Sequence, residues 1–408
     1  MGILHDDVVI INQSKNEAEP SVITINCPDK TGLGCDLCRI LLFFGLTIVR
    51  GDVSTDGKWC YIVLWVIPKP IIKWDTCRWE LLKNRLIGTC PSCSSAFGIS
   101  YYSSELQSSM VTDVFLIKLF CYDRKGLSHD VTAVFSKLEL NIKKVKVSTT
   151  PVGTVMNLFF VTDTRELLHT KMRQEETYEA LVEVMQAAII SCNIEKVGPE
   201  VTACSQASPF LSSAITNDVV LRTSNNVSVT MDNSFSPAHT LVQIVCQDHK
   251  GLLYDIMRTL KDYNIQISYR RFYLKQGRKC EIDLFITQAD GKKIIDPSMQ
   301  RALSSRLQME LLQPLRVAVV SRGPDTELLV ANPVELSSKG RPLVFHDITL
   351  ALNMLNTCIF LAEIGRHVIG DQEWEVYRVL LDEGTSLSTP RRKIEEGVWK
   401  LLMGWEQI

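Results

Sequence analysis

The stretch Cys27-Pro-Asp-Lys-Thr-Gly-Leu-Gly-Cys-Asp36 decides the fold, because it occurs three times along the chain. The second copy reads Cys121-Tyr-Asp-Arg-Lys-Gly-Leu-Ser-His-Asp130, and the third reads Cys246-Gln-Asp-His-Lys-Gly-Leu-Leu-Tyr-Asp255. All three share the pattern C-x-D-x-x-G-L-x-x-D. Agreement of this kind over ten residues, three times in one chain, indicates an internal repeat.

The residues that flank each copy agree in register. Before the motif, every second residue is apolar, which predicts a strand that ends at the motif. After it, apolar residues recur at the spacing of one helix face. The motif is therefore expected to form a strand-to-helix turn. The alternating positions are Ile23, Ile25 and Cys27, then Ile117, Leu119 and Cys121, then Val242, Ile244 and Cys246.

A fourth copy is degraded. The residues from Val344 to Leu355 carry the same helical stripe, and Asp347 matches the last Asp of the motif. Without gaps, however, Leu343 falls at the glycine position and Gly340 at the first Asp position. We expect the fold to persist in this copy and the chemistry of the turn to be lost.

Downstream of the motif each copy predicts two strands and a second helix. A last strand is expected to close the first three copies, near residues 97–102, 189–197 and 315–321. The order β-α-β-β-α-β is the ferredoxin-like unit, an α+β fold with both helices on one face of an antiparallel sheet. Such a unit leaves strand edges and a sheet face uncovered, so the repeats are expected to pair.

The first helix of each repeat is expected to end at a residue that tolerates the left-handed conformation. Gly45, Asn264 and Asn356 fit this role at equivalent positions, and Glu139 is the exception in the second repeat.

The repeats divide the chain as follows. The segment 199–238 is rich in Ser, Thr, Asn and Pro and lacks periodicity, which indicates a linker between two pairs of repeats. The predicted repeats are 19–110 with a loop insertion, 111–198, 239–321, and the degenerate 322–408.

Composition excludes several classes of protein. The 44 Lys and Arg residues against 46 Asp and Glu residues leave no basic excess, so nucleic acid is not an expected partner. The apolar run 40–49 is shorter than the roughly 20 residues of a membrane helix, and the N-terminus lacks the pattern of a signal or transit peptide. Thirteen cysteines without an export signal are expected to be reduced thiols. We expect a cytoplasmic protein with no membrane contact.

A unit of this order whose first turn reads D-x-x-G-L-x-x-D resembles the ACT domain. Four such units over nearly the whole chain resemble the plant ACT-domain-repeat proteins and, more distantly, the regulatory tail of the bacterial uridylyltransferase nitrogen sensor. The resemblance implies a regulatory sensor that is not an enzyme, uses no cofactor and binds free amino acids at its turns, often between paired units. It also implies that a partner protein or a homodimer carries the output.

The resemblance also implies which residues contact the ligand. At the turns they are Asp29, Gly32 and Leu33, then Asp123, Gly126 and Leu127, then Asp248, Gly251 and Leu252. A polar residue that enters the second strand completes the site, and register places Thr47, Asn141, Gln266 and Cys358 there. The second repeat, with Asn141, comes closest to the binding pattern.

Elementary chemistry supports this assignment. A glycine before the helix lets a ligand approach the backbone, and the helix N-terminus favours a carboxylate. The Asp of the turn could then accept hydrogen bonds from an α-ammonium group. The alternative is structural: the Asp caps the helix and the Gly supplies only a positive φ. Asp36, Asp130 and Asp255 are interpreted as partners of the helix dipole.

Two patterns in the sequence resemble metal sites. His129-Asp130 and His346-Asp347 look like HD dyads, but His129 aligns with Cys35 and Tyr254, so the position has no fixed ligand type. Cys35-x-x-Cys38 and Cys90-Pro-Ser-Cys93 have zinc-like spacing, yet the first pair lies on a helix, and the second pair could instead be redox-active. Neither pattern carries a predicted metal site. A scaffold that binds proteins and no small ligand remains the alternative function.

Overall fold

The computed structural model describes residues 8–16, 19–56, 58–69, 74–91, 113–150, 152–216, 227–274, 279–322, 325–336, 339–370, 372–381 and 390–405. The chain divides into two compact parts, which we call modules. The first module holds residues 1–101 and 222–314, and the second holds 102–221 and 315–407. None of the described helices has the length and apolar character needed to cross a membrane.

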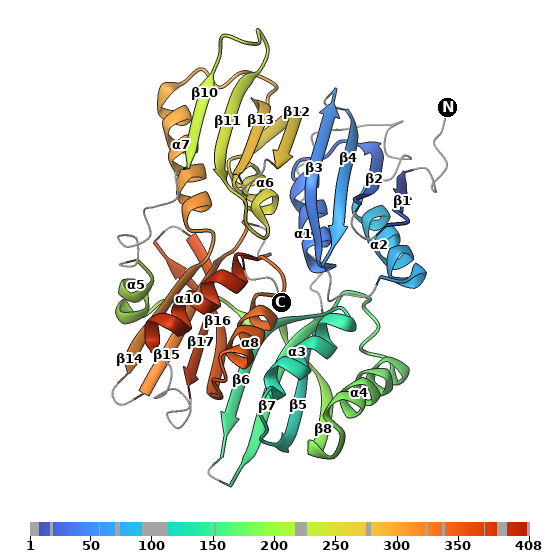
Figure 1. Cartoon of the computed structure of the whole chain (residues 1–408), viewed down its shortest axis with the longest axis vertical. Coiled ribbons are helices and arrows are strands. Elements are labelled where there is room, and N and C mark those ends of the chain that lie inside the picture. Colours follow the sequence, from blue (N-terminus) through green and yellow to red (C-terminus); the bar gives the residue numbers. More distant parts are fainter. Residues whose placement is uncertain are drawn as a thin grey trace. The chain divides into compact units, whose positions relative to one another are not determined.

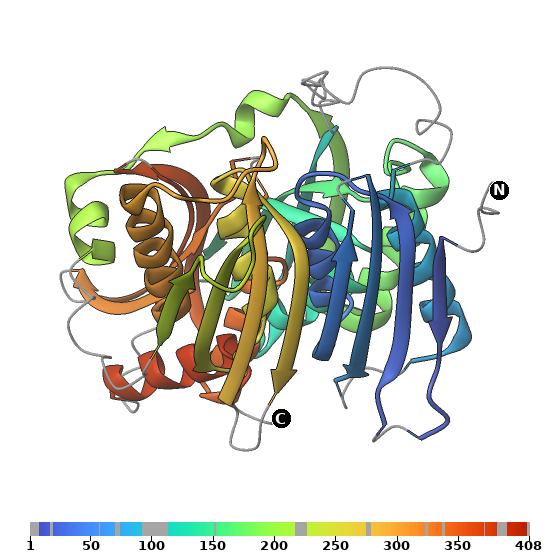
Figure 2. The same ribbon diagram turned by 90° about the horizontal axis from the view of Figure 1, so that it is seen from above.

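The first module pairs the first repeat with the third. Its helices α1 (Leu33–Phe43), α2 (Thr76–Thr89), α6 (Leu252–Asp262) and α7 (Pro297–Leu312) lie on one side of a single sheet (Figures 1 and 2). In sheet order the strands are β1 (Val9–Asn12), β2 (Ser21–Pro28), β4 (Trp59–Pro68), β3 (Leu46–Thr55), β12 (Ile265–Leu274), β13 (Lys279–Gln288), β11 (Thr240–Gln247) and β10 (Ser228–Asp232).

The second module pairs the second repeat with the fourth. Its repeat helices are α3 (Leu127–Lys137), α4 (Lys171–Met185), α8 (Val344–Met354) and α10 (Arg391–Leu402). In sheet order the strands are β14 (Arg316–Arg322), β15 (Asp325–Pro333), β17 (Gln372–Leu381), β16 (Ile359–Ile369), β6 (Leu140–Thr149), β7 (Thr154–Asp163), β5 (Val114–Tyr122) and β8 (Ile189–Val197), with β9 (Ser205–Gln206) beside β16.

The ferredoxin-like fold and the pairing of repeats are confirmed, but the expected place of the linker is wrong. The paired repeats alternate along the chain, so residues 199–238 do not separate one pair from the other. The sequence could not reveal this because all the repeats present similar strand edges. The segment also contains structure of its own: α5 (Pro209–Thr216), two residues of β9, and the edge strand β10.

Helix α5 covers one face of the fourth repeat. Leu211 and Ile215 on α5 are buried with Leu329 and Trp374 of the sheet. Leu328, the neighbour of Leu329 along β15, belongs instead to the core beneath the repeat helices. Because side chains alternate between the two faces of a strand, α5 lies on the face opposite those helices.

Each pair of repeats is joined by two antiparallel strands, β3 with β12 and β6 with β16. In the first module Tyr269 pairs with Ser54, and Tyr273 pairs with Arg50. Position 50 corresponds to 269 and position 54 to 273, so an approximate twofold axis exchanges the two pairs. The joined strands satisfy the edge that a lone repeat would leave open.

The strand-to-helix turns have the predicted backbone. Gly32, Gly126 and Gly251 adopt φ values of 81°, 78° and 84° and precede α1, α3 and α6. Leu343 takes the same left-handed conformation, with φ of 62°, before α8. The fourth turn has therefore kept its backbone path although it has lost its glycine.

The ends of the first helices agree equally well. Gly45, Asn264 and Asn356 have positive φ values of 77°, 54° and 56°. Glu139, expected to be the exception, adopts the same conformation with φ of 58°. Its buried carboxylate accepts a hydrogen bond from Arg165 at 2.8 Å, which helps to hold this glutamate in place.

One expected strand belongs to a different repeat. Residues 315–321 were expected to close the third repeat, but β14 pairs with β15 and forms the edge of the fourth. Strands β1 and β10, which precede their repeats, fill that edge in the first and third. Only β8 among the described strands closes its repeat from the C-terminal side as predicted. The predicted strand 97–102 lies outside the described residues.

Candidate functional site

The turn of the second repeat presents backbone N–H groups at a helix start. Asp123 N donates to Gly153 O at 2.8 Å, and this bond extends the hairpin to the beginning of the turn. The first helical bond runs from Asp130 N to Gly126 O at 3.0 Å. The N–H groups of Ser128 and His129 precede that bond, so the helix itself offers them no acceptor.

A basic side chain of the turn pairs with the last Asp of the motif in each of the first three repeats. Arg124 Nη2 lies 2.5 Å from Asp130 Oδ2. Arg124 is the third residue before α3, and Asp130 is the fourth residue of that helix. The same two positions pair Lys30 with Asp36 at 3.7 Å and His249 with Asp255 at 2.9 Å. The last Asp of the motif therefore holds the turn closed. Sequence reasoning singled out this Asp and missed its partner, which was visible as a basic residue directly after the first Asp of the motif.

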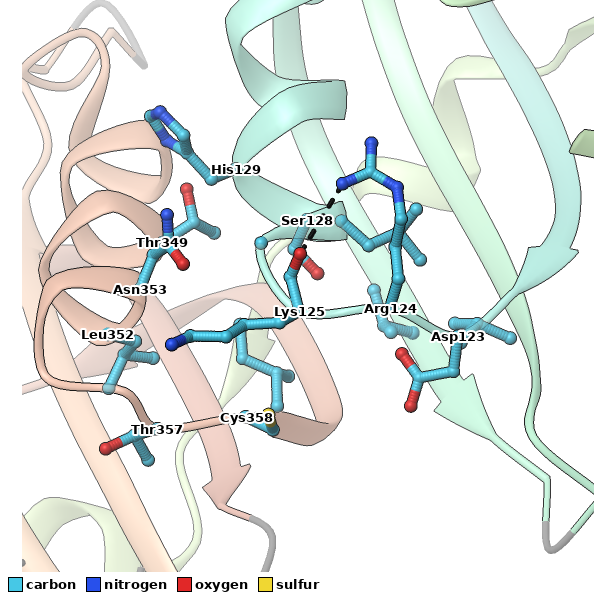
Figure 3. Close-up of a pocket in the computed structure, with 15 residues that line it drawn as sticks. Asp123, Arg124, Lys125, Ser128, His129, Thr349, Leu352, Asn353, Thr357 and Cys358 are labelled. Carbon is cyan, nitrogen blue, oxygen red and sulfur yellow. Dashed lines mark hydrogen bonds between the residues drawn. The ribbon is translucent and has the colours of Figure 1, made fainter. Parts of the chain in front are cut away.

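A cavity of about 110 Å³ lies between the turn of the second repeat and helix α8 of the fourth. Figure 3 shows the turn facing the C-terminal half of α8 and the start of β16. The second repeat contributes residues 123–129 with Val147 and Val155, and the fourth contributes Thr349, Leu352, Asn353, Thr357, Cys358 and Ile359.

The walls of the cavity combine charge with apolar surface. Lys125 reaches across it, and its ammonium group donates a hydrogen bond to Asn356 Oδ1 of the fourth repeat. Arg124 Nη1 donates to Lys125 O at 3.4 Å on the turn itself (Figure 3). Asp123 lies on the same side of the cavity as Arg124 (Figure 3). Val147, Val155 and Ile359 supply apolar lining.

The structure brings together only some of the predicted site residues. Asp123, Gly126 and Leu127 line the cavity, whereas Asn141 is not among its lining residues. Asn141 Nδ2 donates instead to Thr164 Oγ1 of its own repeat at 2.9 Å. The residue at the matching position of the paired repeat, Cys358, lines the cavity in its place. The twofold relation explains the exchange, because each turn faces the second strand of its partner.

The two histidines of the suspected HD dyads meet at the twofold axis. The rings of His129 and His346, which occupy equivalent positions on α3 and α8, stack with centroids 4.8 Å apart. Thr132 Oγ1 and Thr349 Oγ1, also equivalent, lie 3.1 Å apart. Burial lowers the pKa of His129 from its ordinary value of 6.5, against the opposing effect of Asp130. This is a packed helix interface.

In the first repeat a lysine from the third repeat lies over the glycine of the turn. A Cβ atom on Gly32 would lie 2.7 Å from Lys261 Cε, and Lys261 Nζ lies 3.7 Å from Asp36 Oδ1. Asp29 accepts a hydrogen bond from Thr55 Oγ1 at 2.7 Å, and burial raises its pKa. Thr47 is exposed. Lys261 corresponds to Asn353, which lines the cavity at the turn of the second repeat.

Apolar side chains pack around the third turn. Leu42 holds the position of Asn353 there and is buried in one cluster with Leu252 and Leu253. His249, the residue after Asp248, is buried, and its Nε2 lies 2.9 Å from Oδ2 of the buried Asp255. Gln266, which was predicted to complete the ligand contacts of the third repeat, is half-buried at the start of β12.

The fourth turn is filled by polar side chains of its own repeat. Asn332 Nδ2 donates to Glu375 Oε2 at 3.2 Å and to Arg341 O at 3.3 Å. Tyr377 also donates to Glu375, and Asn332, Glu375 and Arg341 are all buried. A buried hydrogen-bonded cluster of these side chains thus takes the place of the motif residues at the fourth turn.

The structure also bears on the alternative roles. The N-cap residues of α1, α3 and α6 are the glycines, so the Asp of the turn does not occupy the helix N-cap. Cys35 and Cys38 are buried in the core, and Cys93 lies outside the described residues. Within the ranges that the structure covers, no three His, Cys, Asp or Glu side chains are placed to hold a metal ion.

Comparisons with known proteins agree with the repeat pattern. Residues 115–177 match the ACT domain, 11–91 the N-terminal model of ACT domain-containing protein ACR10, 228–325 an ACR9-like ACT-like domain, and 326–404 the C-terminal model of ACR9. The chain is 65% identical to ACT domain-containing protein ACR10 of Arabidopsis thaliana over the full length of both. It is 49% identical to ACR9 of the same plant, over 99% of this chain and 100% of ACR9.

Proposed function

Because the chain belongs to the ACR family of ACT domain-containing proteins, we propose that it is a non-enzymatic sensor that binds a free amino acid between its second and fourth repeats. The observation that carries the proposal is the cavity at the turn of the second repeat, which is lined by Gly126 and by the facing Asn353 of the fourth repeat. At the turn of the first repeat, by contrast, Lys261 lies over the glycine, 2.7 Å from the place of a Cβ atom on Gly32.

The lining suits both ends of a zwitterion. The N–H groups of Ser128 and His129, together with the dipole of α3, favour the carboxylate. The Asp123 carboxylate offers an acceptor for the α-ammonium group, and Asn353 and Thr357 add polar atoms from the other repeat. Apolar surface from Val147, Val155 and Ile359 is available to a side chain.

The size of the cavity supports a small ligand. Its volume of about 110 Å³ is well below the roughly 300–1,000 Å³ typical of sites for drug-sized molecules. A ligand with few atoms makes few contacts, so we expect dissociation constants in the roughly micromolar to millimolar range. A ligand held by both repeats would strengthen their association, which gives binding a structural consequence. The location in the cytoplasm and the transfer of the signal to a partner protein are parts of the same proposal.

The test is a thermal-shift scan of the full chain against the twenty amino acids at millimolar concentration. A ligand present at 100 times its Kd stabilises the folded protein by about 2.7 kcal/mol, which is a shift of several degrees. Asp123→Ala is expected to abolish the shift and Asn141→Ala to preserve it, because Asn141 points to Thr164. If no amino acid raises the Tm, the sensor proposal fails and an interaction scaffold is favoured.

A further inference from the structure

We propose that Arg270 of the third repeat selects the repeat with which the third repeat pairs, because its side chain fits only against a partner that has glycine at the position of Gly51. The selection takes place where β3 and β12 join, and it does not rest on the proposed amino-acid binding. Gly51 and Arg270 are equivalent positions of the first and third repeats, which the approximate twofold axis exchanges. The partner that this surface fits is the first repeat, of the same chain or of a second copy.

The guanidinium group of Arg270 fills the space that a side chain at position 51 would occupy. A Cβ atom on Gly51 would lie 2.9 Å from Arg270 Nη2 and 3.1 Å from Leu64 Cδ2. On the helix side, Arg270 Nη1 lies 3.7 Å from Met257 Sδ of α6. Arg270 is only 2% exposed, so its guanidinium group cannot move into solvent to make room for a larger residue at position 51.

The charge of Arg270 adds to the effect of its size. Its Nε has no hydrogen-bond partner within the described part of the chain, and its Nη1 contacts the thioether of Met257, which is a weak acceptor. A buried charge with such partners costs free energy. A pair of third repeats from two chains would place two Arg270 side chains in the same space. Pairing of this repeat with its own copy through β12 is therefore excluded.

The second module has different residues at the same positions. Val145 of the second repeat and Ala362 of the fourth correspond to Gly51 and Arg270, and both are fully buried in the core. These two side chains are each of modest size, whereas the first module combines one long side chain with none. Arg270 placed against Val145 or Ala362 would meet the side chain that Gly51 lacks. The third repeat therefore fits the first repeat and does not fit the second or the fourth.

The helices that cover this position differ between the modules as well. Met257 on α6 corresponds to Thr132 and Thr349, whose Oγ1 atoms lie 3.1 Å apart in the second module. A third repeat paired with the second would exchange the hydroxyl partner of Thr132 for a thioether, which is a weaker acceptor. The helix layer thus supports the selection that Arg270 makes in the sheet.

The first test is a double-mutant cycle in the full chain. Gly51→Val and Arg270→Ala, made together, recreate the combination of Val145 with Ala362. We expect Gly51→Val alone to lower the Tm by more than about 5 °C through overpacking. In the Arg270→Ala background the same substitution should cost less than about half as much, because the group that the valine meets is gone. Ser54→Val, at an exposed position of the same strand, is the control and should change the Tm by less than about 2 °C.

The second test measures the choice of partner. Ser54 and Tyr269 are paired across β3 and β12, and Ser148 is the equivalent of Ser54 in the second repeat. A full chain with all three replaced by cysteine is refolded from urea in a glutathione redox buffer, and mass spectrometry maps its disulfides. With Arg270 present, the link between positions 54 and 269 should exceed the link between 148 and 269 by more than about tenfold. Arg270→Ala should lower that ratio at least about fivefold.

Two results would overturn the proposal. One is a loss of Tm from Gly51→Val that is equal with and without Arg270→Ala, and the other is an unchanged ratio of the two links in Arg270→Ala. Circular dichroism shows whether Arg270→Ala refolds. If it does not, Arg270→Val, which leaves a smaller cavity, takes its place in both tests with the same expected results.

Discussion

Asn353 of the fourth repeat faces Gly126 of the second, so closely that a Cβ atom at position 126 would lie 3.3 Å from Asn353 Oδ1. In the first module the equivalent Lys261 lies over Gly32, where the same Cβ would come within 2.7 Å of the lysine chain. The two positions have the same backbone and differ in the side chain that the paired repeat supplies. The lysine therefore comes closer to its glycine than the asparagine does.

The substitution Asn353→Lys should therefore close the cavity. The longer chain can cross Gly126 as Lys261 crosses Gly32 and reach Asp130 as Lys261 reaches Asp36. We expect the Tm shift produced by the amino-acid ligand to disappear while the Tm without ligand changes by less than about 2 °C. Asn353→Ser, which leaves the space open, is the control. A wild-type ligand shift in Asn353→Lys would contradict the assignment of the site.

Gly126→Ala and Gly153→Ala separate backbone strain from contact with the ligand. Both glycines have positive φ, 78° and 76°, so each substitution should cost about 1–2 kcal/mol of unfolding free energy. Only the Cβ at 126 has neighbours, since none lies within 4 Å of the Cβ at 153. Urea denaturation should show similar losses, with the ligand shift retained in Gly153→Ala alone. Loss of the shift in both variants would point to strain as the cause.

The stability of the second module should fall as the pH drops below about 6.5. Burial lowers the pKa of His129, with Asp130 and Asp347 acting in the opposite direction. Below 6.5 the unfolded chain takes up a proton on this histidine more readily than the folded one, so acid favours unfolding. His129→Gln should flatten the Tm between about pH 7.5 and 5.5, relative to the wild type. An equal acid-induced fall in both proteins would remove His129 as the cause.

A buried ion pair supports the second repeat. Arg173 on α4 and Asp163 at the end of β7 have side chains only 2% and 1% exposed, with Nε and Oδ2 3.3 Å apart. Arg173→Met leaves the carboxylate buried without this partner and should cost about 3–5 kcal/mol. Arg392→Met, which breaks the exposed helical pair with Glu396, should cost less than about 0.5 kcal/mol. Urea midpoints at constant m-value measure both, and equal losses would show that burial is not decisive.

The alternation of paired repeats predicts that halves of the chain cannot fold alone. A fragment of residues 1–198 contains β3 and β6 without their partners β12 and β16. We expect this fragment to aggregate through its open strand edges and to form a soluble complex when it is produced together with residues 199–408. Size-exclusion chromatography and circular dichroism distinguish the outcomes. A folded, monomeric 1–198 fragment would mean that neighbouring repeats can pair.

Much of the candidate site could be predicted from the repeat. The alignment of Cys27-Pro-Asp-Lys-Thr-Gly with the two other copies of the motif predicts three features. These are the left-handed glycines, the strand before each turn and the helix after it. The role of Asn141 could not be predicted, because register within one repeat does not show which repeat faces which turn. Cys358 is at the same register position, and only the pairing of β6 with β16 brings it to the cavity.

The sequence by itself determined the local structure: four ferredoxin-like repeats, their turns and their helix faces, all of which depend on side-chain periodicity and on residues near in the chain. Tertiary structure alone decided that the first repeat joins the third and the second joins the fourth. It also decided that Lys261 lies over Gly32, whereas Asn353 lines a cavity at the turn of Gly126. The physical reason is that strand edges pair through backbone groups common to every repeat, so the choice of partner is made by side chains that meet only when the repeats pack.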